Sequence, residues 1–233
     1  MKLSLVTTAY NETKIIKKTI LAWSKWLNKQ NIKFEIIVYN DGSTDDTLKK
    51  LKELRTKLTS LKIINGKMNK GYGFGMRQSI KKSKNKYIVT IDSDNQYELA
   101  NIKVFFPLIN KKDQFFTGHR VKKKDNYLKI LADLILRLIV RLIFNTKIKD
   151  TNCALKMFDR KILKKIKLFS NDYSLPTELS LKAEMLGLDI VDLPIKHKSR
   201  QDGKSKINIL FTSLKFLKFL IKLKSKFIIY EKK

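Results

Sequence analysis

Cysteine and histidine are almost absent from this chain. Cys153 is the only cysteine among the 233 residues, so no disulfide can form within the chain. This composition is compatible with a reducing cytoplasmic setting. We expect Cys153 to be a packed core thiol, and we interpret His119 and His197 as structural because they lack the spacing of metal ligands.

Long uncharged apolar runs are also missing. No stretch reaches the roughly 18 uncharged apolar residues that a helix needs to span a bilayer. The apolar content is still 43%, which is enough at this length for one domain with a substantial core. The sequence therefore predicts a folded domain whose contact with a membrane, if it makes one, is from one face.

Acidic residues are scarce relative to basic ones. There are 21 Asp and Glu against 51 Lys and Arg, a formal net charge of +30, which attracts nucleic acid or anionic lipid. Base bias of the genome is an alternative source of part of this excess, because the lysines are spread throughout among many Ile and Asn. No recognition helix or basic-aromatic module is found, so we expect no nucleic acid partner and keep a non-enzymatic basic binding protein as a distant alternative.

Four apolar, β-rich segments alternate with helical patterns over the first 91 residues. The predicted strands cover residues 3–9, 34–39, 61–64 and 87–91, and helices are expected at about 13–27, after the second strand, and at about 76–83. This order predicts an α/β fold with a doubly wound, mostly parallel sheet flanked by helices. The loops that follow the strands should gather over one edge of that sheet.

Two carboxylates with one residue between them follow the fourth predicted strand. Asp92 and Asp94 would project where the backbone leaves the carboxyl edge of the sheet, where α/β proteins place ligands. Hard oxygen donors this close suit Mg²⁺ or Mn²⁺ holding a diphosphate. Acidic residues after a strand also form turns or cap helices, so this pair alone does not distinguish a metal site from a turn or a cap.

Three glycines precede the third predicted helix. Gly71, Gly73 and Gly75 lack the G-x-G-x-x-G spacing of a dinucleotide-binding turn, and they do not follow the first strand. A dehydrogenase is therefore disfavoured. We expect these glycines to let backbone approach backbone or a nucleotide closely.

Six short motifs occur in the order seen in family 2 glycosyltransferases. They are Tyr10-Asn11-Glu12, Asn40-Asp41-Gly42-Ser43-Thr44-Asp45, Asp92-Ser93-Asp94, Gly118-His119-Arg120, the segment from Asp150 to Phe158, and the segment from Arg200 to Lys206. Over roughly residues 1–210 the chain most resembles the dolichol-phosphate mannose synthase and polyprenyl-phosphate hexosyltransferase branch. The resemblance implies a GT-A glycosyltransferase domain over residues 1–207, and the spacing of basic and apolar residues predicts a basic amphipathic C-terminal helix over 208–233.

The resemblance also implies roles for individual residues. The metal ligands would be Asp92, Asp94 and Gln96. Nucleoside contacts would come from Tyr10, Glu12 and Asp41. Donor or acceptor phosphate would be contacted by Arg120, Arg200 and Lys206, and the residues closest to the chemistry would be Asp92, Asp94, Arg120 and Arg200. The chain departs from the family pattern at Ala9, where proline is usual, and at Asn40, where an aspartate is usual, which leaves the donor base open.

The implied reaction is inverting, metal-dependent transfer of a hexose from GDP- or UDP-hexose to polyprenyl (dolichyl or undecaprenyl) phosphate. A phosphate monoester has a second pKa of about 6, so it is largely an oxyanion at neutral pH and can attack without a protein base. The alternative acceptor is a glycan hydroxyl, which would need a carboxylate base, and Glu178 is the candidate. Otherwise Glu178 is a first-turn helix residue favoured by the helix dipole.

Two segments have the pattern of basic amphipathic helices. In residues 208–229, Lys215, Lys218, Lys222 and Lys226 lie on one stripe, and in residues 127–144 charged residues punctuate a largely apolar helix. Each could pack on its own protein. Because the chain also resembles transferases that act on lipid phosphates, we favour peripheral binding of these helices to the anionic cytoplasmic face of a membrane.

Overall fold

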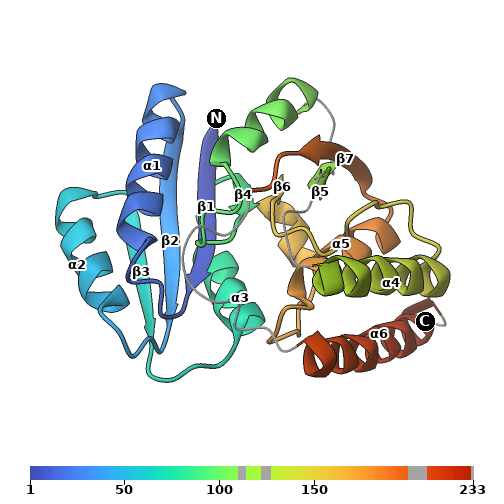
Figure 1. Ribbon diagram of the computed structural model, residues 1–233. Helices are drawn as coiled ribbons and strands as arrows, with labels where there is room; N and C mark the ends of the chain where they lie inside the picture. Colours follow the sequence, from blue (N-terminus) through green and yellow to red (C-terminus); the bar gives the residue numbers. More distant parts are fainter. Residues whose placement is uncertain (110–113, 122–126, 199–208, 232–233) are drawn as a thin grey trace.

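The computed structural model describes residues 1–109, 114–121, 127–198 and 209–231 (Figure 1). Seven strands form one sheet in the order β3-β2-β1-β4-β6-β5-β7. Their bounds are β1 Lys2–Ala9, β2 Lys33–Asp41, β3 Leu61–Gly66, β4 Tyr87–Thr90, β5 Gln114–Arg120, β6 Lys156–Asp159 and β7 Asp189–Ile195. Only β6 runs antiparallel to its neighbours in this sheet, so the mostly parallel α/β sheet predicted from the sequence is confirmed.

Helices cover both faces of the sheet. Apolar side chains of α1 (Ile16–Lys29), α2 (Thr47–Lys57) and the 3-10 segment η1 (Leu99–Leu108) pack with one set of strand residues. Apolar side chains of three other elements pack with the strand residues on the opposite face of the sheet. These elements are α3 (Tyr72–Lys82), α5 (Leu175–Met185) and the short η2 (Arg160–Lys164). The alternation of strand side chains thus builds two core layers, as a doubly wound sheet requires.

Two predicted helices begin at different residues in the structure. The first begins at Ile16 rather than about residue 13, because Ile15 and Ile16 first close a turn onto the Glu12 carbonyl. The third begins at Tyr72 rather than about residue 76, so Gly73 and Gly75 lie inside it. A Cβ on Gly75 would lie 2.4 Å from Thr8 Oγ1, so glycine lets α3 pack closely on β1.

Two further helices lie side by side beyond the β5–β7 end of the sheet (Figure 1). They are α4 (Tyr127–Phe144) and α6 (Ile209–Glu231), and a third apolar cluster joins Val140 of α4 to Phe216, Leu220 and Leu223 of α6. The predicted boundary between residues 207 and 208 falls outside the described residues and stays a prediction. Among the helices that the structure describes, none has the length and hydropathy needed to cross a bilayer.

Candidate active site

The loops that follow β1 and β2 are bound to each other. Asn11, held at a φ of 53°, accepts the backbone N–H of Thr44 on Oδ1 (2.8 Å) and donates from Nδ2 to Thr44 Oγ1 (3.1 Å). The backbone N–H of Glu12 donates to Thr47 Oγ1 (2.8 Å). The parallel pairing of β1 with β2 therefore brings Tyr10, Glu12 and the end of β2 to one edge, as predicted, with Tyr10 and Glu12 partly exposed there.

Asp41, at the end of β2, connects the sheet to the turn before α3. Its carboxylate is buried and accepts the backbone N–H groups of Lys70 (2.8 Å) and Gly71 (2.9 Å). Gly71 has a φ of 97°, a conformation that disfavours other residues, so the glycine and the carboxylate shape the turn together. This structural role accounts for Asp41, and its predicted contact with a nucleoside stays a prediction.

Asp92 and Asp94 follow β4 at the same edge. Ser93 between them is buried and donates to the carbonyl of Thr8 (3.0 Å), while both carboxylates remain partly exposed. Asp92 Oδ1 accepts the hydroxyl of Tyr72 (2.8 Å), and Asp94 Oδ1 accepts the backbone N–H of Gln96 (3.1 Å). Burial and the neighbouring Asp92 raise the pKa of Tyr72 well above its usual value, so Tyr72 stays a protonated donor.

The acidic loop fits a divalent cation that arrives with a diphosphate. Asp92 and Asp94 supply hard oxygen atoms, and within the described residues no group of three or more His, Cys, Asp or Glu side chains converges to form a complete protein cage. Mg²⁺ and similar ions commonly bind through one or two carboxylates plus substrate phosphates. Asp92 and Asp94 are therefore suited to hold a divalent ion for which donor phosphates would supply further oxygen ligands.

Gln96 fixes the acidic loop to the segment after β7. Its side-chain Nε2 donates to the backbone carbonyl of Lys198 (3.3 Å), and its backbone carbonyl accepts the backbone N–H of Lys198 (2.9 Å). The neighbouring rings of Tyr97 and His197 meet edge to face at 5.0 Å. Gln96 therefore holds the acidic loop in place through its hydrogen bonds to Lys198. Metal ligation by Gln96 stays a prediction.

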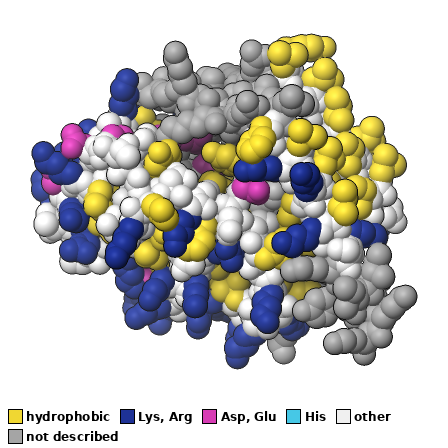
Figure 2. Space-filling model, turned by 90° about the horizontal axis from the view of Figure 1, so that it is seen from below, with side chains coloured by type: hydrophobic (Ala, Val, Ile, Leu, Met, Phe, Trp, Pro, Cys, Tyr) yellow, Lys and Arg dark blue, Asp and Glu magenta, His cyan; other side chains and the backbone are white. Residues whose placement is uncertain are grey.

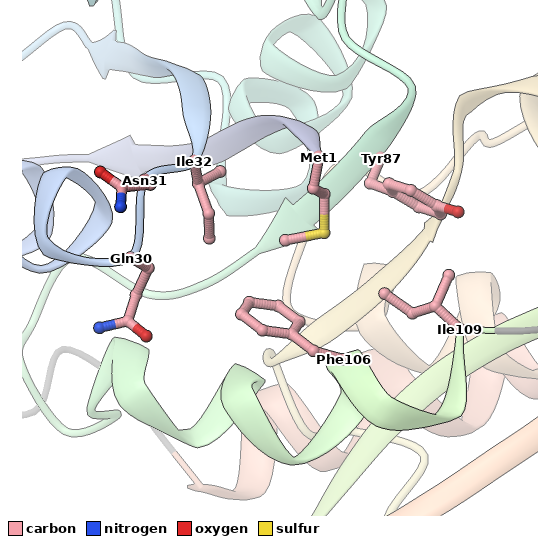
Figure 3. Close-up of a pocket in the computed structure, with 7 residues that line it drawn as sticks. All are labelled: Met1, Gln30, Asn31, Ile32, Tyr87, Phe106 and Ile109. Carbon is pink, nitrogen blue, oxygen red and sulfur yellow. The ribbon is translucent and has the colours of Figure 1, made fainter.

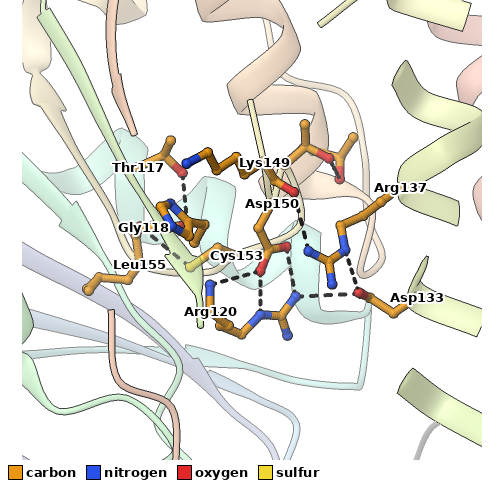
Figure 4. A network of polar contacts seen from close by, with 12 residues as sticks. Thr117, Gly118, Arg120, Asp133, Arg137, Lys149, Asp150, Cys153 and Leu155 are labelled. Atoms are coloured by element: carbon orange, nitrogen blue, oxygen red, sulfur yellow. Dashed lines mark hydrogen bonds and ion pairs between the residues drawn. The ribbon is translucent and has the colours of Figure 1, made fainter. Parts of the chain in front are cut away.

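Arg120, at the end of β5, lies in a network of acidic and basic side chains (Figure 4). Its guanidinium donates to Asp150 from Nε (2.6 Å) and Nη2 (2.9 Å), and Nη2 lies 3.6 Å from Asp133 Oδ1 on α4. Asp133 in turn pairs with Arg137 (2.8 Å), whose Nη1 donates to the Lys149 carbonyl (3.4 Å). The network joins the sheet edge to α4, and a phosphate bound by Arg120 would share the guanidinium with these carboxylates.

Two other predicted phosphate contacts cannot be placed. Arg200 and Lys206 lie outside the described residues, so their roles stay predictions.

The two histidines are structural in the described chain, since His119 Nδ1 lies 2.7 Å from Asp192 Oδ1 and His197 packs on Tyr97.

Glu178 is buried in the core. Its fully buried carboxylate accepts the backbone N–H groups of Phe169 (2.9 Å) and Ser170 (2.8 Å) and pairs with Lys182 (2.6 Å). It lies in the first turn of α5, as its alternative interpretation predicted. These contacts favour a structural role over that of a general base.

Lys156 lies close to the Arg120–Asp150 pair, through its contacts with Thr117 and Thr151, and no pattern in the sequence indicates this position. It lies on β6 with no exposed surface, and its ammonium donates to Thr117 Oγ1 (3.1 Å), the Thr151 carbonyl (3.1 Å) and Ser180 Oγ (2.7 Å). Burial lowers the pKa of Lys156 from 10.5 to about 8. A single lysine in a chain with this many gives no sequence signal of burial.

The free energy of unfolding should rise with pH above 8 because of Lys156. The unfolded lysine titrates near 10.5 and the folded one near 8, so between these values the unfolded state binds more protons. The contribution over this window is about 3 kcal/mol. Urea titrations at pH 7 to 10.5 should show this rise in the parent and its absence in Lys156→Met; a constant difference between the two proteins would contradict the assignment.

A separate cavity lies at the opposite edge of the sheet (Figure 3). Its volume is 460 Å³, and it is lined by the amino ends of β1 and β4 together with the end of α1 and η1. The lining residues are Met1, Gln30, Asn31, Ile32, Tyr87, Phe106 and Ile109. Since the acidic loop follows the carboxyl end of β4, this cavity is not part of the candidate site.

A comparison with known protein families decides the class of this site. The model of glycosyl transferase family 2 matches residues 4–167, which include the acidic loop, Arg120 and the Asp150 motif. The chain belongs to glycosyl transferase family 2. The family 2 protein is thus a glycosyltransferase, and the enzyme class that the motifs indicated is confirmed.

Curated relatives cover most of this family 2 chain. A dolichyl-phosphate beta-glucosyltransferase of Dictyostelium discoideum is 25% identical, over 97% of this chain and 75% of the relative. A UDP-N-acetylglucosamine–dolichyl-phosphate N-acetylglucosaminyltransferase of Methanococcus voltae is 29% identical, over 82% and 84%. A dodecaprenyl-phosphate galacturonate synthase of Rhizobium johnstonii is 24% identical, over 90% and 62%. The resemblance to the polyprenyl-phosphate branch is confirmed.

The fold also matches solved glycosyltransferases. Glucosyl-3-phosphoglycerate synthase from Mycobacterium tuberculosis, crystallised with Mn²⁺, UDP and phosphoglyceric acid, aligns with a TM-score of 0.75 at 19% identity, over 96% of this chain and 78% of that one. At this identity the likeness concerns the fold alone. The GT-A type expected from the motifs is confirmed.

Proposed function

We propose that this glycosyltransferase moves a hexose from a UDP- or GDP-hexose to a polyprenyl phosphate, with Mg²⁺ or Mn²⁺ at Asp92 and Asp94. The observation that carries the proposal is the network of Figure 4, which links Arg120 at the end of β5 to α4. Helix α4 has an exposed apolar side. The three relatives named above act on dolichyl or dodecaprenyl phosphate, according to their names.

The chemistry follows from an acceptor that is already an oxyanion. Its oxygen forms a bond to the anomeric carbon as the bond from that carbon to the diphosphate breaks, which inverts the configuration. A divalent ion would supply neutralisation of charge on the departing diphosphate. Asp92 and Asp94 would hold this ion, and the Arg120 guanidinium, which also pairs with Asp150, would donate to a phosphate. No carboxylate base is required, consistent with the buried Glu178.

The outer side of α4 is apolar and exposed. We name it the α4 ridge: Tyr127, Leu128, Leu131, Leu134, Ile135, Leu138 and Leu142, each at least 42% exposed. Figure 2 shows hydrophobic side chains gathered on the right of one face and Lys and Arg over its left and centre. The neighbouring helix α6 adds exposed Phe211, Leu214 and Ile221 beside exposed lysines, while Leu220 packs inward. An apolar ridge beside cations suits the anionic, cytoplasmic face of a membrane.

Polar substitutions on the α4 ridge should release the protein from vesicles. Burying even half of two leucine side chains contributes about 2 kcal/mol, so Leu138→Ser/Leu142→Ser should weaken binding more than tenfold. Flotation with vesicles that contain anionic lipid measures this. Leu21→Ser/Val104→Ser replaces two exposed apolar residues outside α4, on α1 and η1, and should float like the parent. Equal flotation of the ridge variant and the parent would refute docking through α4.

The donor and metal can be tested by thermal shift. A ligand present at 100 times its Kd that binds only the folded state contributes about 2.7 kcal/mol, which raises the Tm by roughly 5–10 °C for a chain of this size. We expect a UDP- or GDP-sugar to do this with Mn²⁺ present and to do much less without it. A panel of nucleotide sugars with no effect in either condition would contradict the proposal.

A further inference from the structure

Tyr72 contacts the acidic loop from an element that carries no predicted site residue. It is the first residue of α3, and its hydroxyl donates to Asp92 Oδ1 at 2.8 Å. The contact spans 20 residues of sequence and joins the turn held by Asp41 to the loop after β4. Tyr72 is therefore placed to set the orientation of one of the two carboxylates that would hold the metal.

The ring of Tyr72 is held in turn by the segment before α5. Tyr173 stacks on it with ring centroids 5.4 Å apart and an interplanar angle of 20°. The same segment is fixed to α3, because the Asn171 carbonyl accepts the Phe74 N–H (3.2 Å) and Arg77 donates to the Leu168 carbonyl (3.3 Å). Residues 168–174 follow the last residue of the family match, so this support is built by a part of the chain that the family model does not cover.

Two of the glycines before and within α3 explain how the segment comes so close. A Cβ on Gly71 would lie 2.4 Å from the Asn171 carbonyl oxygen, and one on Gly73 would lie 2.6 Å from the Asp172 carbonyl oxygen. Any larger residue would push the segment away from Tyr72. The glycine-rich stretch therefore serves close approach of backbone to backbone, one of the two roles predicted from the sequence.

A hydroxyl is a suitable partner for a metal-binding carboxylate. It fixes one oxygen of Asp92 through a hydrogen bond and, being neutral, brings no positive charge of its own to that carboxylate. The pairing of Asp150 with the Arg120 guanidinium contrasts with this, because there the carboxylate is neutralised. Partners that orient metal ligands in this way typically change metal affinity 10- to 100-fold when removed.

We propose that Tyr72 is a positioning residue for Asp92 in the binding of a divalent cation with a nucleoside diphosphate, and that Tyr173 supports it. The inference rests on the proposed function, since it takes Asp92 to be a metal ligand. Under this proposal metal affinity depends on Tyr72, a residue outside the acidic motif.

The test compares Mn²⁺ binding by the parent and Tyr72→Phe at saturating UDP or GDP, measured by titration calorimetry. The variant keeps the ring and the stack and loses only the hydroxyl, so its Tm should stay within a few degrees of the parent's. We expect its Kd for Mn²⁺ to rise about 10- to 100-fold. Sugar transfer should fall at limiting Mn²⁺ and recover at excess, a rescue that a general loss of structure would not show.

Tyr87→Phe is the matched control, because Tyr87 lines the cavity at the opposite sheet edge and should leave Mn²⁺ affinity unchanged (Figure 3). Tyr173→Ala should weaken Mn²⁺ binding severalfold; unchanged affinity would remove Tyr173 from the proposal. Equal Kd values for Tyr72→Phe and the parent would overturn the role of Tyr72 and leave the proposed function standing. A parent that binds no Mn²⁺ with either nucleotide would overturn the proposed function and this inference with it.

Discussion

Replacing Asp94 with asparagine is expected to lower the rate of sugar transfer about a thousandfold. The amide keeps the size of the side chain but removes the negative charge that would hold a divalent ion against the donor's phosphates. Loss of charge stabilisation on the leaving group then raises the barrier by about 4 kcal/mol. Initial rates of transfer at fixed Mn²⁺ and saturating donor measure the effect directly.

The matched control for that variant is Glu53→Gln. Glu53 is an exposed carboxylate on α2, so this substitution changes the net charge by the same amount at a site distant in sequence from the acidic loop. It should transfer sugar at the parent's rate. If Asp94→Asn retained more than a tenth of the parent's rate at the same Mn²⁺ concentration, the assignment of Asp94 to the metal site would be wrong.

Replacing Asp150 with alanine should lower the free energy of unfolding by about 3–5 kcal/mol, the usual cost of breaking a buried ion pair. The Asp150 side chain is fully buried and forms two hydrogen bonds with Arg120, whose own side chain is 11% exposed. Without Asp150 the guanidinium would keep the longer ion pair with Asp133, at 3.6 Å. For a chain of this size the Tm should fall by roughly 6–20 °C.

Urea denaturation and thermal melting of Asp150→Ala test this expectation. Glu53→Ala provides the comparison, because removing an exposed carboxylate usually changes the free energy of unfolding by less than about 0.5 kcal/mol. A loss below about 1 kcal/mol in Asp150→Ala would mean that the Figure 4 network does not stabilise the end of β5.

The strands and the acidic loop could be predicted because their signals are local. Residues 87–91 are apolar and β-rich, and Asp92 and Asp94 follow them directly, so the structure confirms a loop with both carboxylates at the carboxyl edge of β4. Helix starts were less accurate. The sequence predicts the start of α3 four residues late, because the packing of Gly73 and Gly75 against neighbouring backbone and side chains outweighs their low helix propensity.

The partners of the site residues could not be predicted, because they depend on tertiary contacts. Nothing in the sequence pairs Tyr72 with Asp92 or places Lys156 in the core. The network around Arg120 had one local signal, the spacing of four residues between Asp133 and Arg137 on a predicted helix. That spacing does not reveal Arg120, which reaches Asp133 only through the fold.

Transfer of a labelled hexose from UDP- or GDP-hexose to polyprenyl phosphate in anionic vesicles tests the account most directly, run with Mn²⁺ and again after chelation of all divalent ions. We expect label in the lipid fraction with Mn²⁺, almost none after chelation, and almost none with Asp94→Asn. Label that reaches the lipid equally well after chelation, or that never reaches it from any donor, would contradict the account.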